Sequence, residues 1–167
     1  MPEDPAIHEL ASTLVAELNR NKKAVVTAES CTGGWLAKAL TDVPGSSGCF
    51  GYGIVSYSNG AKESMLGVHN RTLAEHGAVS EAVVREMAEG ALRLSGADIA
   101  VAVSGVAGPD GGSDEKPVGT VWFAWSMRRP GGVTTDTDLR RFEGNRERIR
   151  MQTVIHGLKG VRGRLPI

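Results

Sequence analysis

The chain has 167 residues, 41% of them apolar and 23% charged, a composition typical of one globular domain and not of a disordered chain. Its formal net charge is zero, so the overall field does not favour nucleic-acid binding. No apolar run reaches the roughly 18 residues that a membrane span needs, and the two cysteines are too few for a disulfide framework, so we expect a soluble cytoplasmic protein.

The first quarter of the sequence predicts two helices that flank a short buried strand. Asp4 and Pro5 are typical of a helix start, and an apolar stripe at helical spacing then continues to Leu18. The continuous apolar run Ala24–Ala28 predicts a strand that is buried on both faces. A pair of glycines then leads into a second helix, Trp35–Asp42.

The middle of the sequence predicts a strand and two further helices. Strand-forming residues alternate over Phe50–Tyr57. Ser58 is a suitable cap for a short helix that ends near Leu66. Ser80 is the N-cap of the most strongly amphipathic helix, which Gly96 closes.

The last part of the sequence predicts three strands and a final helix around a long loop. Ile99–Val103 is a second continuous apolar strand, and it leads into a glycine-rich loop over residues 104–119. Val118–Ser126 and Val133–Phe142 are predicted to form a hairpin, and Arg146–Lys159 the last helix.

Alternating helices and buried strands predict a single α/β domain over residues 1–167, a three-layer α/β/α sandwich with a mixed, mostly parallel sheet. In such sheets ligands bind beyond the carboxyl ends of the parallel strands. That rule predicts a site built from three loops, at residues 29–34, 57–62 and 104–119.

The first of these loops contains the candidate nucleophile. Ser30 follows a buried strand directly and precedes a Gly-Gly turn, where backbone N–H groups can hold an oxyanion or a phosphate. A serine in this position is also a common helix cap. Cys31 is a rival nucleophile, because a helix N-terminus lowers the pKa of a thiol.

Lysine is the candidate base, because no histidine is tied to this loop by its spacing. Tyr57 ends the second strand and Lys62 follows five residues later, so both are expected at the edge that carries Ser30. A lysine amine that burial keeps neutral can accept a serine proton, and a tyrosine can relay or steer that proton. Taken alone, Lys62 also fits an ordinary surface lysine.

The glycine-rich loop is the candidate substrate-binding loop, since its backbone N–H groups can donate to phosphate or ribose oxygens. It matches no nucleotide-triphosphate or dinucleotide motif, its acidic residues do not follow calcium-loop spacing, and we expect neither metal nor cofactor. The residues expected to contact the substrate are Thr32, Gly33, Gly34, Ser46, Ser58, Asn59, Ser104, Gly105, Ala107, Gly108, Gly111, Gly119 and, for its phosphate, Arg146.

Five segments of the sequence together resemble the CinA C-terminal domain family: "TAESCTGG", "GYGIVSYSNGAKESMLGV", "GAVSEAVVREMAEGAL", "SGVAGPDGGSDEKPVGTVWFAW" and "FEGNRERIR". The resemblance implies hydrolysis of the carboxamide of nicotinamide mononucleotide (NMN), in pyridine-nucleotide salvage, by a catalytic serine, tyrosine and lysine. These roles fall on Ser30, Tyr57 and Lys62.

The resemblance also bears on partners and on the size of the domain. Many relatives carry an additional N-terminal domain that resembles molybdopterin-binding proteins, which this chain is expected to lack. We expect a homo-oligomer that binds a small-molecule substrate and neither nucleic acid nor membrane. The alternatives are a non-catalytic nucleotide-binding module and a protein associated with competence or DNA damage.

Overall fold

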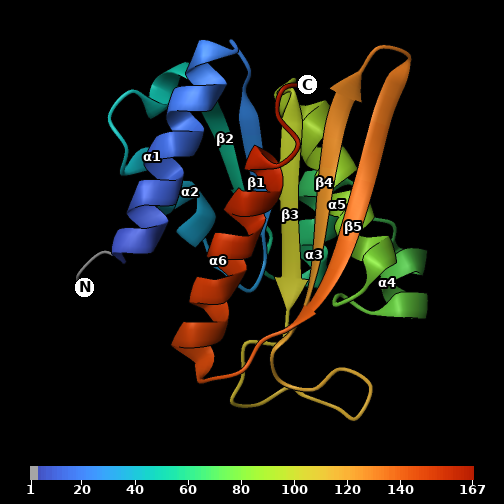
Figure 1. The fold of residues 1–167 in the computed structure, drawn as a ribbon. Coiled ribbons are helices and arrows are strands. Elements are labelled where there is room, and N and C mark those ends of the chain that lie inside the picture. Colours follow the sequence, from blue (N-terminus) through green and yellow to red (C-terminus); the bar gives the residue numbers. More distant parts are fainter. Residues whose placement is uncertain (1–3) are drawn as a thin grey trace.

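The computed structural model describes residues 4–167, in which one five-stranded sheet lies between two layers of helices (Figure 1). The strands are β1 (Val25–Glu29), β2 (Phe50–Val55), β3 (Ile99–Gly105), β4 (Thr120–Arg129) and β5 (Gly132–Arg141). The helices are α1 (Pro5–Arg20), α2 (Trp35–Thr41), α3 (Asn59–Leu66), α4 (Asn70–His76), α5 (Glu81–Ser95) and α6 (Arg146–Arg162). None of these helices is both long and apolar enough to cross a membrane.

The sheet is mixed and mostly parallel, as predicted. Its strand order is β2-β1-β3-β4-β5, and β1 pairs in parallel with both β2 and β3. β4 is antiparallel to β3, and β5 is antiparallel to β4. All described strands except β4 therefore run in one direction, and the ends of β1, β2, β3 and β5 lie at one edge of the sheet.

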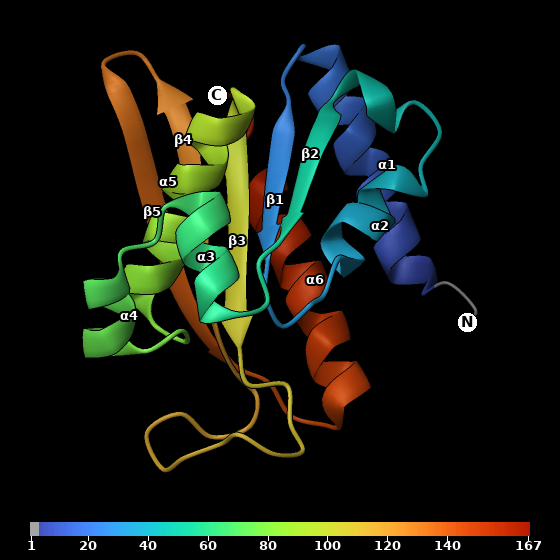
Figure 2. The same ribbon diagram turned by 180° about the vertical axis from the view of Figure 1, so that it is seen from behind.

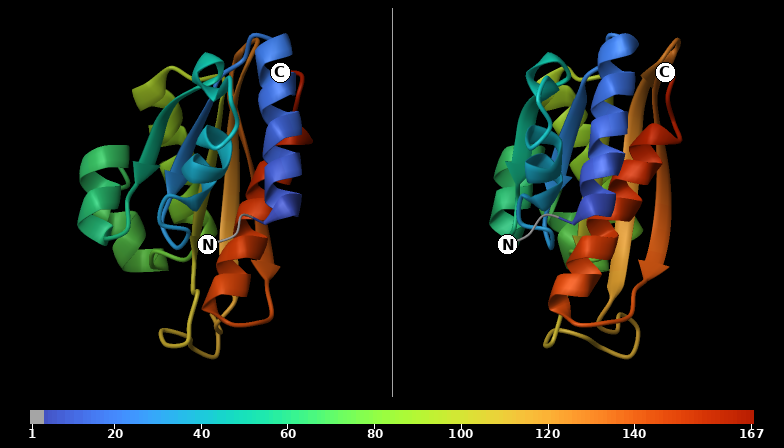
Figure 3. Two further views of the ribbon diagram at one scale, coloured as in Figure 1. Left: turned by 90° about the vertical axis from the view of Figure 1, so that its left-hand side faces the viewer. Right: turned by 60° about the vertical axis from the view of Figure 1, so that its left-hand side comes forward.

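Helices cover both faces of this sheet, which confirms the three-layer prediction. α1, α2 and α6 lie on one face, and α3 and α5 on the other (Figures 2 and 3). β3 shows why its sequence is continuously apolar: Val101 and Val103 enter the core beneath α6, whereas Ala100 and Ala102 enter the core beneath α5. Each face of the strand meets a helix layer, so residues 99–103 are all apolar.

Capping residues explain where most helices begin. The carboxylate of Asp4 accepts the N–H groups of the first turn of α1. Ser58 Oγ and Ser80 Oγ accept a backbone N–H at the starts of α3 and α5. These three starts confirm the predictions. The structure adds α4, which the sequence did not predict because it has no side-chain cap and buries only Leu73.

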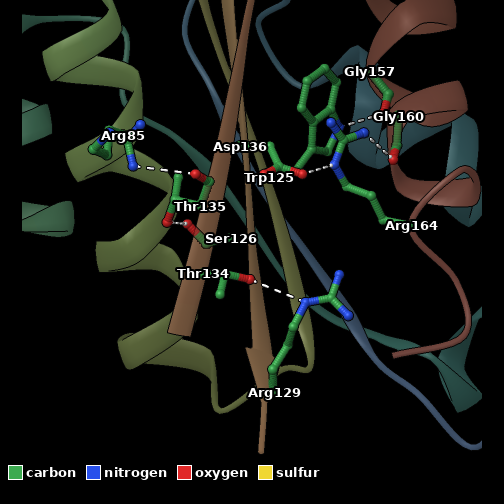
Figure 4. A network of polar contacts seen from close by, with 10 residues as sticks. All are labelled: Arg85, Trp125, Ser126, Arg129, Thr134, Thr135, Asp136, Gly157, Gly160 and Arg164. Carbon is green, nitrogen blue, oxygen red and sulfur yellow. Dashed lines mark hydrogen bonds and ion pairs between the residues drawn. The ribbon is translucent and has the colours of Figure 1, made fainter. Parts of the chain in front are cut away.

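Residues from both helix layers make polar contacts with β4 and β5 (Figure 4). On one side, the Trp125 indole N–H donates to the Gly157 carbonyl of α6 at 3.1 Å. Arg164 lies over the Trp125 ring at 4.1 Å and donates to the Asp136 carboxylate at 2.9 Å. On the other side, Arg85 of α5 donates to the Thr135 carbonyl at 3.3 Å. These contacts fix the C-terminal part of α6 against the sheet, and the helix extends to Arg162, beyond the predicted Lys159.

Candidate active site

The carboxyl edge of the sheet gathers the three predicted loops and a fourth segment, the beginning of α6. β5 ends at Arg141 on this edge because it runs in the same direction as β1, β2 and β3, and α6 begins five residues later. Figure 1 shows the loop after β3 and the first turn of α6 at the same end of the molecule. The candidate site is therefore bounded by residues 29–34, 56–62, 104–119 and 142–150.

Ser30 and Lys62 meet at this edge, although 32 positions separate them in the chain. Lys62 Nζ lies 3.1 Å from Ser30 Oγ. The Ser30 N–H donates to the carbonyl of Val103, which ties the serine to the end of β3. Lys62 occupies the first turn of α3, and its residue is only 1% exposed, whereas a surface lysine would reach into water. The pair therefore has the geometry of a nucleophile and its base.

The surroundings of the Lys62 amine favour its neutral form. The amine also lies 2.9 Å from the carbonyl oxygen of Ser56 and 3.0 Å from that of Tyr57. Carbonyl oxygens only accept, so a neutral amine can give one N–H to each and keep its lone pair for the Ser30 hydroxyl. Burial lowers the pKa of Lys62 below its usual range, because desolvation disfavours the ammonium.

The phenol of Tyr57 contacts Arg146 and not this pair. Its side chain is exposed, and Arg146 Nη2 donates to the phenol oxygen at 3.2 Å. Arg146 Nη1 donates to the carbonyl of Gly108 in the glycine-rich loop at 2.7 Å. Tyr57 thus reaches Lys62 through its backbone carbonyl, whereas its side chain links the second strand to α6 and to the glycine-rich loop.

A buried carboxylate that the sequence analysis missed holds the turn after Ser30. Glu29 accepts from the Thr32 hydroxyl at 2.6 Å and from the N–H groups of Leu36 and Ala37 at 2.8 and 3.0 Å. Burial raises the pKa of Glu29, and the hydrogen bonds from these donors oppose that rise. An acidic residue at the end of an apolar strand, just before a helix, was the available signal, since a helix N-terminus attracts a carboxylate.

The thiol of Cys31 is a poor nucleophile in this environment. The residue is 6% exposed and packs in the core beneath α1, α2 and α6. Burial raises the pKa of Cys31 to about 12, so the thiol stays protonated at neutral pH. The thiolate is the reactive form of cysteine, and its absence favours Ser30 over Cys31.

The glycine turn after Ser30 offers fewer free donors than expected. The Gly33 N–H donates to the Ser30 carbonyl at 3.0 Å, and the Gly34 N–H is close enough to the Glu29 carboxylate to lower its pKa. The N–H of Thr32 has no acceptor among residues 4–167. Of the three predicted amide donors in this turn, Thr32 is therefore the one left available to a ligand.

The other predicted contact residues divide between the two edges of the sheet. Ser46 lies in the short 3₁₀ turn before β2, next to the start of β1, at the edge opposite Ser30. This placement corrects the expectation that Ser46 contacts the substrate. The remaining predicted residues lie at the carboxyl edge, at the start of α3, at the end of β3 or in the loop that follows it: Ser58, Asn59, Ser104, Gly105, Ala107, Gly108, Gly111 and Gly119.

A cavity of about 380 Å³ lies on the other side of the Ser30 turn, against α1, α2 and α6. Thr32, Gly33 and Gly34 line it together with Trp35 and Arg150, whereas Ser30 and Lys62 do not. Ser30 and Lys62 therefore lie outside this cavity. No cluster of three His, Cys, Asp or Glu side chains suited to a metal ion occurs among residues 4–167.

Comparison with known proteins identifies close relatives over nearly the whole chain. The sequence model of the CinA C-terminal domain matches residues 7–165. The nicotinamide-nucleotide amidohydrolase PncC of Escherichia coli K12 is 52% identical over 158 residues, covering 93% of both chains. PncC of Pseudomonas putida is also 52% identical, covering 95% of this chain and 96% of that protein. The crystal structure of the competence damage-inducible protein A of Klebsiella pneumoniae superimposes with a TM-score of 0.90 at 44% identity, covering 95% of this chain and 96% of that one.

Proposed function

The chain belongs to the CinA C-terminal domain family, and from this premise we propose that it is an amidohydrolase that converts NMN to nicotinate mononucleotide and ammonia. One observation supports a catalytic role most directly: the buried amine of Lys62 lies 3.1 Å from the hydroxyl of Ser30. A non-catalytic nucleotide-binding module has no need for this pair. The relatives named for nicotinamide-nucleotide hydrolysis supply the substrate class.

The first half of the proposed reaction forms an acyl-enzyme. Ser30 Oγ attacks the carboxamide carbon of NMN, and its proton passes to the neutral amine of Lys62. The tetrahedral intermediate then breaks its C–N bond, and the Lys62 ammonium protonates the departing nitrogen, which leaves as ammonia. A neutral Lys62 also avoids placing an ammonium beside the positively charged pyridinium ring of NMN before the attack.

The second half of the reaction returns the enzyme to its starting state. A water molecule attacks the ester carbon while Lys62 accepts the water proton. The C–Oγ bond then breaks, Ser30 regains its proton from Lys62, and nicotinate mononucleotide departs. In both halves the negative oxygen of the intermediate needs a donor, and the free N–H of Thr32 is our candidate for it.

Arg146 and Tyr57 are proposed to orient the nucleotide. Arg146 bridges the Tyr57 phenol and the Gly108 carbonyl with only part of its five donors, so it retains N–H groups for the phosphate. The backbone amides of the glycine-rich loop lie on the same side and supply further donors. Tyr57 in this proposal supports Lys62 through its carbonyl and steers Arg146 through its phenol.

The function is tested by measuring ammonia release from NMN with the purified protein, without added metal or nucleoside triphosphate. We expect turnover in the wild type, none with Ser30→Ala, and most of it retained with Cys31→Ala, which serves as the matched control one residue away. Binding of NMN without ammonia release would identify a non-catalytic module. Loss of activity in Cys31→Ala with retention in Ser30→Ala would instead make this a thiol enzyme.

A further inference from the structure

Arg150 of α6 reaches across to the turn that carries Ser30. Its Nε donates to the Cys31 carbonyl at 3.0 Å, and its Nη2 donates to the Thr32 carbonyl at 3.0 Å. The guanidinium also lies 5.5 Å from the centre of the Trp35 ring. Both carbonyl contacts join residues more than 100 positions apart, so they bind the start of α6 to the turn after β1.

The two carbonyl contacts fix the orientation of a peptide plane. A peptide unit is planar and trans, so the N–H of Thr32 points away from the Cys31 carbonyl that Arg150 holds. Arg150 approaches the turn from α6, and the Thr32 N–H therefore points away from α6. This is the N–H that has no acceptor among residues 4–167. The hydroxyl of Thr32 donates to the Glu29 carboxylate, which gives the same residue a second fixed contact.

The guanidinium of an arginine fits these two carbonyls better than the ammonium of a lysine would. Two of its N–H donors lie in one plane at a fixed spacing and meet two successive carbonyls at equal distance. Arg150 packs directly against Gly33, where a Cβ would lie in ordinary contact with Nη2 at 3.4 Å. Positive φ at Gly33 and Gly34 gives the turn the shape that exposes both carbonyls to α6.

We propose that Arg150 is a positioning residue: by holding the carbonyls of Cys31 and Thr32, it aims the Thr32 N–H at the oxygen of the tetrahedral intermediate formed on Ser30. The proposal rests on the proposed function for its role in turnover. Arg150 itself does not touch the substrate, since it lines the cavity on the side of the turn away from the catalytic pair.

The first test compares Arg150→Ala with Lys159→Ala, which removes an exposed cation from the far end of the same helix. Losing one oxyanion donor typically lowers kcat by about 10²–10³, so we expect Arg150→Ala to lose up to that factor in kcat with little change in KM. Lys159→Ala should behave as the wild type. Guanidinium ions at millimolar concentration should restore part of the lost kcat, because the cavity that Arg150 lines admits them. A rise in KM at constant kcat would overturn the proposal.

The second test does not depend on NMN turnover. Labelling of Ser30 by a sulfonyl fluoride, followed by mass spectrometry, reports the reactivity of the hydroxyl and of the donors around it. We expect slower labelling in Arg150→Ala, with guanidinium restoring part of the rate. If the wild type releases no ammonia but the labelling difference is present, the positioning role holds and the proposed function fails. Equal labelling of wild type and variant, including none in either, overturns the positioning role.

Folding of the variants is controlled by thermal unfolding. Should Arg150→Ala fail to fold, Arg150→Lys provides the same comparison, because one ammonium cannot occupy both donor positions of the guanidinium. Arg150→Lys is expected to fold and to label more slowly than the wild type. Labelling at the wild-type rate in a folded Arg150→Lys would contradict the proposal.

Discussion

The protonation state of Lys62 makes the sharpest prediction for catalysis. An unperturbed lysine has a pKa near 10.4, so only about one in 10³ is neutral at pH 7.4. Burial lowers the pKa of Lys62, and each unit of lowering raises the neutral fraction tenfold in this range. As the pH falls below that pKa, the amine becomes protonated and cannot accept the Ser30 proton. We therefore expect kcat/KM to rise tenfold per pH unit and then level off below the usual lysine pKa.

Steady-state rates of ammonia release between pH 5 and 10 measure this profile, with Lys62→Arg as the comparison. A guanidinium does not lose its proton in this range, so Lys62→Arg should lose about 10²–10⁴ in kcat/KM, the usual contribution of a general base. The variant should also lose the rising limb. A limb that persists in Lys62→Arg, or one centred at or above the usual lysine pKa, would refute the reasoning.

The protonation of Lys62 also makes the free energy of unfolding depend on pH. The folded pKa of Lys62 lies below its unfolded value, so between the two the unfolded chain binds more protons and the free energy of unfolding rises with pH. Urea denaturation of wild type and Lys62→Met across this window isolates the effect. The wild type should show the steeper rise with pH, and equal slopes would show that Lys62 does not titrate differently on folding.

Three further predictions concern Tyr57, Arg146 and Gly160. Tyr57→Phe should leave the position of the pH limb unchanged, since the phenol does not contact Lys62, and a shifted limb would contradict this geometry. Arg146→Ala should raise KM for NMN by about 10- to 100-fold, the loss of charged hydrogen bonds of about 1.5–3 kcal/mol; an unchanged KM would remove it from the phosphate site. Gly160→Ala places a methyl group into the Trp125 ring and should cost about 1–3 kcal/mol in urea denaturation. Gly60→Ala, with its nearest atom 3.9 Å away, is the control and should lose no stability.

Local signals predicted most of the fold. Caps such as Ser58 and Ser80 lie in the sequence beside the helices that they begin, and a strand buried on both faces has an unbroken apolar run. α4 lacked both signals. Its position depends instead on the packing of Leu73 against the core beneath α5.

The candidate site was predictable where one rule of topology applied. Parallel strands end at a common edge, and this places Ser30 and Lys62 close together without any motif. The role of Glu29 had a local signal, an acidic residue just before a helix, and its contacts lie within eight residues. Arg150 instead contacts a turn more than 100 positions away, and no sequence spacing indicates such a contact. For Ser46 the sequence predicted a place in the site, but this residue precedes β2 and lies at the edge where the parallel strands begin.

The reversed direction of β4 has a practical consequence. Because β4 runs against its neighbours, the turn that joins it to β5 lies at the end of the molecule opposite Ser30 (Figure 1). The space around Gly131 and Gly132 is open, but both have positive φ, so a label belongs on a neighbouring residue of this turn. This tip is therefore a natural attachment point for a fluorophore or for surface immobilisation, leaving the reactive end open to solution.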